Sequence, residues 1–505
     1  MSELLPAQQS LSRPEAVTAE IGILFVDLDG SLIASNMLVE SFLKAIRHDP
    51  KVLFKAPLWL AEGRIAFKSH VSEYPLPDVT AVPFHEEVVT VLKELKHDGC
   101  RLVLATASHR RVAEAIAAET GLFDDVLATD ETRNLKGRNK LDAIQQYCRE
   151  HGFDKFAYLG DSWADVPIWE RAAKALVVAP SRRLRNRLSK TGRPLETLVE
   201  RRRNWKAYFK ALRPHQWMKN ILVFLPLVLA HDLADAWKWL YALIAFVAFS
   251  VCASAVYLVN DLVDLEADRR HPTKRKRPFA SGRIPVEFGL VAPPILVVIG
   301  LGLSALTADA RFSVMLLFYL VCSALYCLWL KRIALIDVFL LSGLYMMRVQ
   351  AGGWATAVLV SPWLLIFSLF FFLSLAFAKR FVELDRHELS ADMHDTGRGY
   401  RKIDVTSLAS MGLASGYIAV LVLALYINDQ IGLSHSADAS RALYGRPKIL
   451  CMLCPILLFW VSRLWMLARR NELHDDPVVF ALKDHMSQLL GALSAATVLL
   501  AWLLN

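Results

Sequence analysis

Hydrophobic residues are distributed unevenly along this chain of 505 residues. Up to about Arg213, short apolar runs alternate with amphipathic stretches, whereas long apolar runs dominate the sequence that follows. Single hydrophobic cores rarely grow beyond roughly 250 to 300 residues, so a chain of this length needs at least two units. The pattern therefore predicts a first unit of soluble character and a second unit built from long apolar helices.

Three short apolar runs in the first unit predict strands that are buried on both faces of a parallel sheet. These runs are 21–26, 101–105 and 155–159. Helical periodicity fills the intervals, and it is clearest in 86–96, 110–120 and 139–150. Strands that alternate with helices predict a doubly wound α/β fold, in which ligands bind at the carboxyl ends of the strands.

The same pattern predicts the domain boundaries. Residues 21–180 form the predicted α/β domain, and within it about 34–84 is predicted to be a small helical cap that selects the substrate. Residues 1–20 are expected to be a disordered tail without the features of a secretory signal. Residues 181–211 are expected to be a basic, membrane-proximal linker, which leaves 212–505 as the membrane domain.

The predicted strand ends carry side chains suited to phosphoryl transfer. The residues expected to meet there are Asp27, Asp29, Thr106, Lys140, Asp161 and Asp165. A carboxylate such as Asp27 can attack phosphorus if Mg²⁺ and Lys140 offset the negative charge, and Asp29 can then protonate the leaving oxygen. Asp161 and Asp165 supply the oxygen ligands that Mg²⁺ prefers, while the Thr106 hydroxyl can grip the phosphate.

Four motifs in this half resemble those of the haloacid dehalogenase superfamily in order and spacing. They are Asp27-Leu-Asp29-Gly30-Ser31, Leu104-Ala-Thr106, Lys140 and Gly160-Asp161-Ser162-Trp-Ala-Asp165. The resemblance covers about 22–180 and implies a phosphatase, although Ser31 stands where threonine is more usual. Two alternatives remain. In the first, the acids only cap turns. In the second, the fold is an inactive phosphatase, but the presence of both Asp27 and Asp29 argues against this alternative.

Apolar runs of roughly 20 residues, long enough to cross about 30 Å of hydrocarbon, recur from Asn220 onward. About nine such runs predict an all-α, polytopic membrane bundle. Their approximate centres are Leu225, Ala248, Val298, Leu320, Leu344, Phe370, Val420, Leu458 and Leu493. The run around Leu225 fits this pattern least well, because it is short and Pro226 interrupts it.

The net charge of +9 is concentrated beside the predicted membrane segments. Thirteen Lys or Arg residues but only two acids lie between Ser181 and Lys219, which suits anionic lipid headgroups, so we expect no nucleic-acid partner. The other basic loops are 269–283, 331–332 and 379–402. With nine spans threaded, these loops share one side, which predicts a multi-pass protein of the bacterial inner membrane with a cytosolic N-terminal domain. The exceptions to this rule are Arg441, Arg446 and Lys448.

An acidic stripe is predicted at the end of the second span. Asp261, Asp264 and Asp268 lie within roughly 60° of one another at about 100° per residue of helix, with Asn260 beside them. Three carboxylates in a low-dielectric setting require a cation between them, and Mg²⁺ that bridges a diphosphate is the obvious candidate.

A basic segment follows the acidic stripe directly. Six Lys or Arg residues occupy the nine positions 269–277, among them Lys274, Arg275 and Arg277. They can grip further phosphate oxygens, or they can form an ordinary positively charged loop on the cytosolic side. Both interpretations account for part of the charge.

This second half resembles the UbiA-type prenyltransferase superfamily over about 212–505. The acidic stripe matches its first aspartate-rich motif. Three segments are more narrowly similar to the branch that transfers 5-phosphoribosyl from phosphoribosyl diphosphate to decaprenyl phosphate. They are Arg213-Pro-His-Gln-Trp-Met-Lys219-Asn220, Tyr257-Leu-Val-Asn260-Asp261 and His271-Pro-Thr-Lys274-Arg275-Lys-Arg277-Pro278. The resemblance implies Mg²⁺ held by the acidic stripe, with Lys219 and Arg275 stabilising the departing diphosphate.

The loop in which relatives that prenylate aromatic acids carry a second aspartate-rich motif is different in this chain. It begins Lys379-Arg380-Phe-Val-Glu383, a basic pair with one acid. Such a loop suits the phosphate of a polyprenyl acceptor better than a second Mg²⁺. Further residues that can bind this phosphate are Arg348, Arg398 and Tyr400. Each of them can also be an ordinary loop or helix-end residue.

The combined expectation is a bifunctional membrane enzyme. Its membrane domain would transfer 5-phosphoribosyl to polyprenyl phosphate, and its phosphatase domain would remove the ribose 5-phosphate. One alternative is an aromatic prenyltransferase that uses polyprenyl diphosphate, with a phosphatase of unrelated substrate. Another is a non-enzymatic lipid-binding scaffold. Lipid length, reaction order and oligomeric state are left open at this stage.

Overall fold

A computed structural model describes residues 21–131, 133–190, 192, 194–200, 204–387, 399–434, 444–473 and 477–504, without the side chains of 386 and 387. The chain divides into two compact units. The first comprises Met1–Leu212 and Leu258–Ala292, and the second comprises Arg213–Tyr257 and Pro293–Asn505. The expected tail at 1–20 and the candidate residue Arg398 lie outside the described residues.

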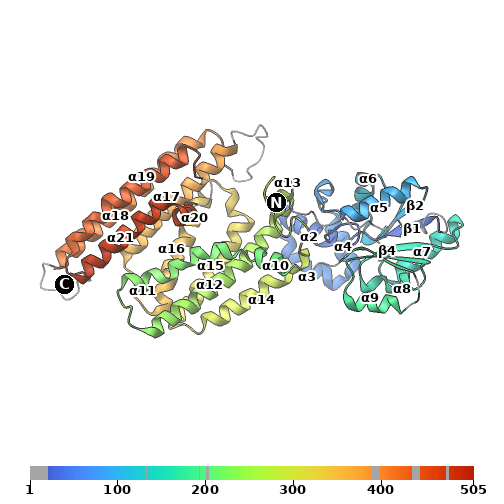
Figure 1. Cartoon of the computed structure of the whole chain (residues 1–505), viewed down its shortest axis with the longest axis horizontal. Helices are drawn as coiled ribbons and strands as arrows, with labels where there is room; N and C mark the ends of the chain where they lie inside the picture. Colours follow the sequence, from blue (N-terminus) through green and yellow to red (C-terminus); the bar gives the residue numbers. More distant parts are fainter. Residues whose placement is uncertain are drawn as a thin grey trace, which may run out of the picture. The chain divides into compact units, whose positions relative to one another are not determined.

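The first unit is built on a six-stranded parallel sheet in the order β3-β2-β1-β4-β5-β6. Figure 1 labels its strands β1, β2 and β4. The strands are β1 (Ile23–Val26), β2 (Arg101–His109), β3 (Asp125–Thr129), β4 (Ala157–Gly160), β5 (Lys174–Val178) and β6 (Leu195–Val199). The chain runs outward from β1 through β2 to β3 and then crosses back to β4 on the other side of β1. Ligands of open α/β sheets bind at such a switch point, next to the carboxyl ends of the strands.

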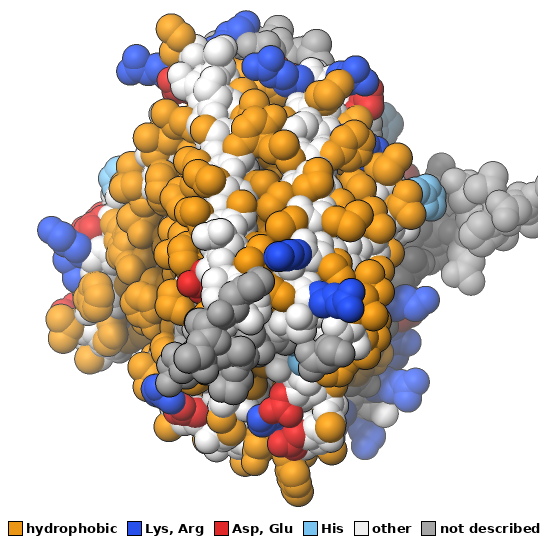
Figure 2. Space-filling model, turned by 90° about the vertical axis from the view of Figure 1, so that its left-hand side faces the viewer, with side chains coloured by type: hydrophobic (Ala, Val, Ile, Leu, Met, Phe, Trp, Pro, Cys, Tyr) orange, Lys and Arg blue, Asp and Glu red, His pale blue; other side chains and the backbone are white. Residues whose placement is uncertain are grey.

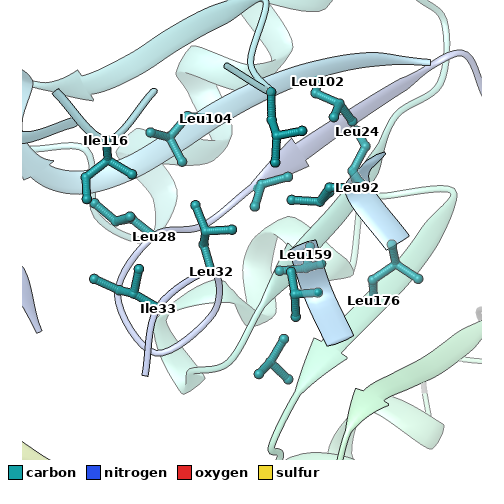
Figure 3. Packing of buried hydrophobic residues seen from close by; sticks show 14 of the residues in the cluster. Leu24, Leu28, Leu32, Ile33, Leu92, Leu102, Leu104, Ile116, Leu159 and Leu176 are labelled. Carbon is teal, nitrogen blue, oxygen red and sulfur yellow. The ribbon is translucent and has the colours of Figure 1, made fainter. Parts of the chain in front are cut away.

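Helices cover both faces of this sheet, and its central strands β1 and β4 are therefore buried at every position. In β1, Leu24 and Val26 pack toward the helices α5 (Glu86–His97) and α6 (Arg110–Thr120). The alternate residues Ile23 and Phe25 pack in a second cluster with α7 (Arg138–His151), α8 (Val166–Trp169) and α9 (Arg182–Ser189). Figure 3 shows the first cluster, in which Leu24, Leu102, Leu104 and Leu159 from three strands meet Leu92 and Ile116. The expected doubly wound α/β fold is confirmed.

Two features of this domain differ from the expected pattern. Strand β2 continues through His109 instead of ending before Thr106, because it follows β3 through a register shift between Thr106 and His109. The expected linker contributes α9 and the edge strand β6 to the α/β domain. The basic composition of this segment did not indicate that it belongs to the domain, because only Leu184 and Leu188 of α9 are buried.

The cap segment folds into three helices and one 3-10 turn between β1 and α5. They are α2 (Met37–His48), α3 (Val52–Glu62), α4 (Arg64–Ser72) and η1 (Val79–Ala81). Asn36 caps α2, because its side chain accepts hydrogen bonds from the amides of Leu38 and Val39. The remaining elements of the first unit are η2 (Trp163–Asp165), α10 (Trp205–Ala211), α13 (Leu265–Arg270) and η4 (Lys274–Lys276).

The rest of the described chain is helical. It begins with η3 (Pro214–Phe224), α11 (Leu225–Leu229) and the long α12 (Ala236–Val263), whose last turns belong to the first unit. The helices that follow are α14 (Val286–Ser304), α15 (Arg311–Leu328), η5 (Leu330–Arg332), α16 (Ile336–Thr356), α17 (Pro362–His387), α18 (Asp404–Ser434), η7 (Pro447–Met452), α19 (Leu453–Arg469), α20 (Pro477–Lys483) and α21 (His485–Leu503).

Seven helical segments among the described residues are long and apolar enough to cross a membrane, and this, together with their exposed apolar surface, indicates an integral membrane protein. Large hydrophobic side chains such as Val298 and Val314 are exposed, and hydrophobic side chains cover much of the face in Figure 2. The expected count of about nine is not confirmed. The run around Leu225 forms a 3-10 helix and one short α-helix, and α16 carries the buried charges Asp337 and Arg348.

Candidate active sites

The ends of β1 and β4 bring three carboxylates together. Asp27 follows β1 directly, Asp161 follows β4, and Asp165 ends the 3-10 turn after β4. One oxygen from each of the three lies within 4.8 Å of the others. Among the residues that the structure describes, this is the one group of three potential ligands close enough to share a metal ion. The all-oxygen donor set fits Mg²⁺.

A buried lysine compensates part of this negative charge. Lys140 Nζ lies 2.9 Å from Asp27 Oδ1 and 3.5 Å from Asp165 Oδ1. It also donates a hydrogen bond of 2.9 Å to the hydroxyl of Tyr158, which donates one of 2.8 Å to Asp165. Tyr158 therefore fixes the relative positions of Lys140 and Asp165. The sequence analysis did not identify Tyr158, although a tyrosine hydroxyl in an otherwise apolar strand indicates a buried hydrogen-bond partner.

The crowding of acids changes their protonation. Burial raises the pKa of Asp27 to about 7, an effect that Lys140 opposes and Asp165 reinforces. Burial also raises the pKa of Asp161 to about 8, with Asp27 as the next contribution. Burial alone would lower the pKa of Lys140, but Asp27 and Asp165 outweigh it and raise that pKa. The cluster therefore binds positive charge strongly, as a proton or as a metal ion.

Asp29 is held in place by two hydrogen bonds. Its two carboxylate oxygens accept hydrogen bonds of 2.6 Å from the Met37 amide and from the Ser108 hydroxyl. Burial raises the pKa of Asp29 despite these two hydrogen bonds. A raised pKa favours the protonated form of a carboxyl group, which is the form that acts as a general acid. Sequence analysis did not single out Ser108 as the residue that orients Asp29.

The backbone around the cluster leaves no room for larger side chains. Gly30 has a φ of +76°, and a Cβ atom at this position would lie 2.4 Å from Asp161 Oδ2. Ser31 donates a hydrogen bond of 3.4 Å to the same carboxyl group. Thr106 is fully buried and accepts a hydrogen bond of 3.0 Å from the Ser108 amide. Thr106 therefore helps to shape the turn that presents Ser108.

The cap supplies one further cation. Lys68 on α4 is almost fully buried and donates hydrogen bonds to the Ala107 carbonyl at 2.6 Å and to Asn134 Oδ1 at 2.8 Å. Burial lowers the pKa of Lys68 to about 8, and the charge of Asp29 opposes that effect. The cap therefore closes over the strand ends with a positive charge. No sequence motif distinguished Lys68 from the other cap lysines.

The acidic stripe of the second half is closed by an arginine. Arg277 Nη1 bonds Asp268 and lies 3.3 Å from Asp261 Oδ1, so one guanidinium bridges two carboxylates that are both almost fully buried. Helix α12 ends at Val263, and Asp264 lies half-buried at the junction with α13. Burial raises the pKa of Asp268, and Arg277 opposes this effect.

The expectation of three aspartates around one ion is therefore modified. Asp261, Asp264 and Asp268 are not gathered closely enough to share an ion among the described residues, because Arg277 occupies the space between Asp261 and Asp268. Asn260 lies half-buried in the last turn of α12. Mg²⁺ commonly takes only one or two protein carboxylates together with substrate phosphates, so the pair still fits Mg²⁺ that arrives with a diphosphate.

The cap is bonded to the segment that contains this stripe. Arg269 and Glu40 form two hydrogen bonds of 2.7 Å, and both side chains are buried. Arg270 pairs with Asp78 at 2.7 Å, and Lys44 of α2 pairs with Glu266. Lys274 and Arg275 are exposed. Of the basic residues in this segment, Arg269 and Arg270 thus hold the cap, while Lys274 and Arg275 face solvent.

Within the second unit, Arg348 is buried in a polar cluster. It donates hydrogen bonds to Asn220 Oδ1 and to the Tyr319 hydroxyl, both at 2.9 Å, and to the Leu344 carbonyl at 2.6 Å. Lys219 Nζ lies 5.8 Å from the centre of the Tyr345 ring, and Arg348 lies over the same ring at 5.5 Å. The structure therefore brings Lys219 and Arg348 together around Tyr345.

Arg380 belongs to a separate polar cluster of the same unit. It is fully buried, forms ion pairs with Asp337 and Glu383, and donates a hydrogen bond of 3.0 Å to the Tyr326 hydroxyl. Tyr400 bonds Asp337 from the other side. The expectation that Arg380 binds a lipid phosphate does not fit these contacts well, because Asp337 and Glu383 already balance its charge. Lys379, the neighbouring residue, is half-buried.

Comparisons with known proteins place each half in a family. The model of the UbiA prenyltransferase family matches residues 221–490, and that of the haloacid dehalogenase-like hydrolases matches residues 24–170. The two halves are therefore a transferase-type and a hydrolase-type domain. Proteins of both families generally use Mg²⁺.

Three relatives illustrate the similarity. The uncharacterized protein y4nM of Sinorhizobium fredii is 36% identical over 95% of this chain and 90% of its own length. The nodulation protein NoeC of Azorhizobium caulinodans is 34% identical over 55% of this chain and 88% of its own length. The decaprenyl-phosphate phosphoribosyltransferase of Mycobacterium tuberculosis is 33% identical over 57% of this chain and 92% of its own length.

Proposed function

The chain belongs to the UbiA prenyltransferase family and carries a haloacid dehalogenase-like hydrolase domain, and from this premise we propose that it performs two consecutive reactions on one lipid. The membrane domain transfers 5-phosphoribosyl from phosphoribosyl diphosphate to a polyprenyl phosphate. The hydrolase domain then removes the 5-phosphate of the lipid-linked product. Both reactions take place on the cytosolic side of the bacterial inner membrane.

The observation that carries this proposal is the arrangement of Asp27, Lys140, Asp161 and Asp165 in a chain that also contains the transferase domain. Asp27 is 7% exposed and bonded to Lys140, so its carboxylate is held for attack at phosphorus. A phosphatase joined to a phosphoribosyltransferase has an evident substrate in the product of its partner domain. Removing the 5-phosphate would draw a reversible transfer forward.

In the phosphatase step, Asp27 attacks the phosphorus atom and the ribose oxygen leaves with a proton from Asp29. Water then cleaves the aspartyl phosphate, with Asp29 accepting its proton. Lys140 balances the charge of Asp27, and Lys68 adds a positive charge from the cap. Mg²⁺ held by Asp27, Asp161 and Asp165 would offset the charge of the phosphate.

In the transfer step, a phosphate oxygen of the lipid forms a bond to C1 of the ribose while the bond from C1 to the diphosphate breaks. Negative charge develops on the departing diphosphate, and Arg277, Lys274 and Arg275 are proposed to bind its oxygens. Mg²⁺ that enters with the diphosphate would be held by the pair Asp261 and Asp268 together with the diphosphate oxygens. The similarity to decaprenyl-phosphate phosphoribosyltransferases supports this choice of donor and acceptor.

The buried clusters around Arg348 and Arg380 are proposed to act on the acceptor side in different ways. Within the described part of the chain, Arg348 donates its hydrogen bonds to the neutral groups of Asn220, Leu344 and Tyr319, so its positive charge is available to a lipid phosphate. Arg380 is matched by Asp337 and Glu383 and is proposed to position α16 against α17. The two arginines therefore have separable roles.

One assay tests both reactions. Membranes that contain the chain are incubated with Mg²⁺, phosphoribosyl diphosphate and polyprenyl phosphate, and the lipid products are analysed by mass. We expect polyprenyl-phosphoryl ribose from the unmodified chain and its 5-phosphorylated form from the Asp27→Asn variant. Equal amounts of dephosphorylated product from both would refute the phosphatase assignment. Transfer of a prenyl group to an aromatic acid would refute the transferase assignment.

A further inference from the structure

Helix α3 of the cap has an exposed surface that is largely apolar. Of its eleven residues, only Val52 and Ala56 are buried. Its exposed apolar residues are Leu53, Phe54, Pro57, Leu58, Leu60 and Ala61. Phe54 is 78% exposed and Leu58 is 66% exposed. Soluble proteins rarely leave a continuous apolar surface of this kind uncovered.

These six residues form one continuous face. At about 100° per residue they lie within an arc of roughly 160°, while Val52, Ala56 and Trp59 lie on the opposite side. Other helices of the same unit are different. Helix α5 buries Val88, Val91, Leu92 and Leu95 and exposes mostly charged residues to solvent. The apolar face of α3 therefore requires a partner, whereas the surface of α5 does not.

The neighbouring helix α2 contacts the end of a candidate membrane span. Glu40, Leu43, Lys44 and Arg47 of α2 line a small cleft together with Leu262, Val263, Leu265 and Glu266. Val263 is the last residue of α12, which is one of the candidate membrane spans. The ion pairs from Lys44 to Glu266 and from Glu40 to Arg269 hold α2 against this helix end.

The segment beyond α12 begins and ends at candidate membrane spans. Residues 264–285 connect α12 with α14, and both of these helices are candidate membrane spans. A segment that joins two spans directly lies at the membrane surface. Since α2 is bonded to this segment and α3 follows α2 after the short turn 49–51, α3 belongs to the part of the cap that is tied to the connection between two candidate spans.

The charges around α3 match an anionic lipid surface. Lys51 and Lys55 are exposed at the start of α3, and Arg47 and Arg64 are exposed on the flanking helices α2 and α4. Lys55 lies 3.6 Å from Asp49 in the preceding turn, and the acid of α3 itself is Glu62 at its end. A helix with an apolar face and basic borders is typical of segments that lie in the interface of a bilayer.

We propose that α3 is a membrane-docking helix, which inserts its apolar face into the interfacial layer of the bilayer and brings the phosphatase site to lipid-linked phosphate esters. Helix α4 follows α3 directly and carries Lys68, which bonds the Ala107 carbonyl beside Thr106 in the phosphatase site. A phosphate at the end of a lipid thus reaches the strand ends along the membrane surface. This inference rests on the proposed phosphatase function only for its choice of substrate, not for the docking itself.

Depth-dependent quenching tests the docking. Phe54→Cys, in a Cys451→Ser background, is labelled with an environment-sensitive fluorophore, and the full chain is placed in nanodiscs that contain anionic lipids with a quencher near the headgroup. The matched control is Lys93→Cys on α5, which is exposed in the same unit. We expect strong quenching at position 54, weaker quenching when anionic lipids are replaced by zwitterionic ones, and little at position 93. Equal quenching at both positions overturns the proposal.

A second copy of the chain is the competing occupant. If the label at position 54 is shielded from a water-soluble quencher only when the protein dimerises in the nanodisc, α3 is a protein interface and the proposal is overturned. Shielding that is independent of protein concentration supports the bilayer as the partner.

Kinetics test the consequence for the substrate. Phe54→Asp combined with Leu58→Asp should lower kcat/KM for the lipid-linked 5-phosphate by about tenfold or more, and leave hydrolysis of soluble p-nitrophenyl phosphate within about twofold. The control is Thr90→Asp combined with Lys93→Asp, which adds the same acids to α5. Equal losses on both substrates would overturn the proposal. If the unmodified chain hydrolyses no lipid-linked phosphate, the proposed function fails, and the quenching experiment still decides the docking.

Discussion

Glu40 and Arg269 form a buried, doubly hydrogen-bonded ion pair, in which both nitrogen-to-oxygen distances are 2.7 Å. Glu40 lies in the first turn of α2, whose first amide donates to Asp29 of the phosphatase site. Arg269 follows directly after Asp268 of the aspartate-rich segment. One ion pair therefore links elements of the two proposed active sites across 229 positions of sequence.

Replacing Glu40 with glutamine removes the charge that compensates the buried Arg269. We expect the free energy of unfolding of this unit to fall by about 3–5 kcal/mol, because an uncompensated charge then lies in the interior. Glu40→Leu combined with Arg269→Met should recover most of this loss. Thermal unfolding in detergent measures the difference, and Lys55→Gln, at a half-exposed ion pair, serves as the control. A double variant as unstable as Glu40→Gln would contradict this expectation.

The stability of the metal-free protein should depend on pH through the acid cluster. Burial raises the pKa of Asp27 to about 7 and that of Asp161 to about 8, whereas aspartate in an unfolded chain titrates near about 3.9. Between these values the folded state holds more protons than the unfolded state. The contribution of these two groups to stability is therefore full below about pH 4 and declines as pH rises to about 8.

Mg²⁺ should reverse this loss, because it replaces the protons that the carboxylates release. We expect the rise in Tm on adding Mg²⁺ to be small near pH 5 and several-fold larger near pH 8. Unfolding curves at both pH values, with and without Mg²⁺, measure this rise in Tm. Asp161→Asn should reduce both the pH dependence and the Mg²⁺ effect. A shift in Tm that is the same at both pH values would rule out Mg²⁺ binding at this cluster.

Replacing Gly30 with alanine should abolish the phosphatase reaction while leaving the domain folded. A Cβ atom at Gly30 would lie 2.4 Å from Asp161 Oδ2 and displace that carboxylate. Gly99→Ala is a matched control, because Gly99 also has a positive φ, +84°, but has no atom within 4 Å of the added Cβ. Both variants should lose about 1 kcal/mol of stability from backbone strain. Only Gly30→Ala should stop phosphate release, and equal activity in the two variants would argue against a role for Asp161.

Replacing Arg277 with glutamine should weaken the binding of phosphoribosyl diphosphate. A hydrogen bond to a charged group contributes about 1.5–3 kcal/mol, so we expect KM for this donor to rise by roughly 10- to 100-fold. Arg283→Gln removes an exposed charge from the same segment and should leave KM unchanged. Initial rates of lipid product formation at varied donor concentration provide the measurement. If the two variants have equal KM values, the basic segment acts only through its net charge.

Local patterns predicted much of the α/β domain. The helix expected at 110–120 is α6 with the same bounds, and the strand expected at 21–26 contains β1. Asp27 and Asp161 were found from the sequence because each directly follows an apolar strand. Lys68, Ser108 and Tyr158 could not be assigned in this way, because each acts through a residue that is distant in sequence or hidden within a regular element.

The membrane half was harder to divide into spans. Helix α16 is long enough to cross a bilayer, yet it carries Asp337 and Arg348, whose partners lie on other segments. The run around Leu225 has the composition of a span but forms η3 and α11, where Pro214 and Pro226 occupy the first turns. Hydropathy alone does not report such polar contacts or changes of helix type.

The amino-acid sequence by itself determined the α/β layering, the acids at the strand ends and the order of the two domains. It could do so because the periods of 2 and 3.6 residues arise from backbone geometry and act over a few residues. Only the tertiary structure decided which charges compensate one another, as in Arg277 with Asp261 and Asp268, or Arg380 with Asp337. Electrostatic energy depends on distance through space and on burial. Both are set by the packing of residues that are far apart in the sequence, which a local pattern does not report.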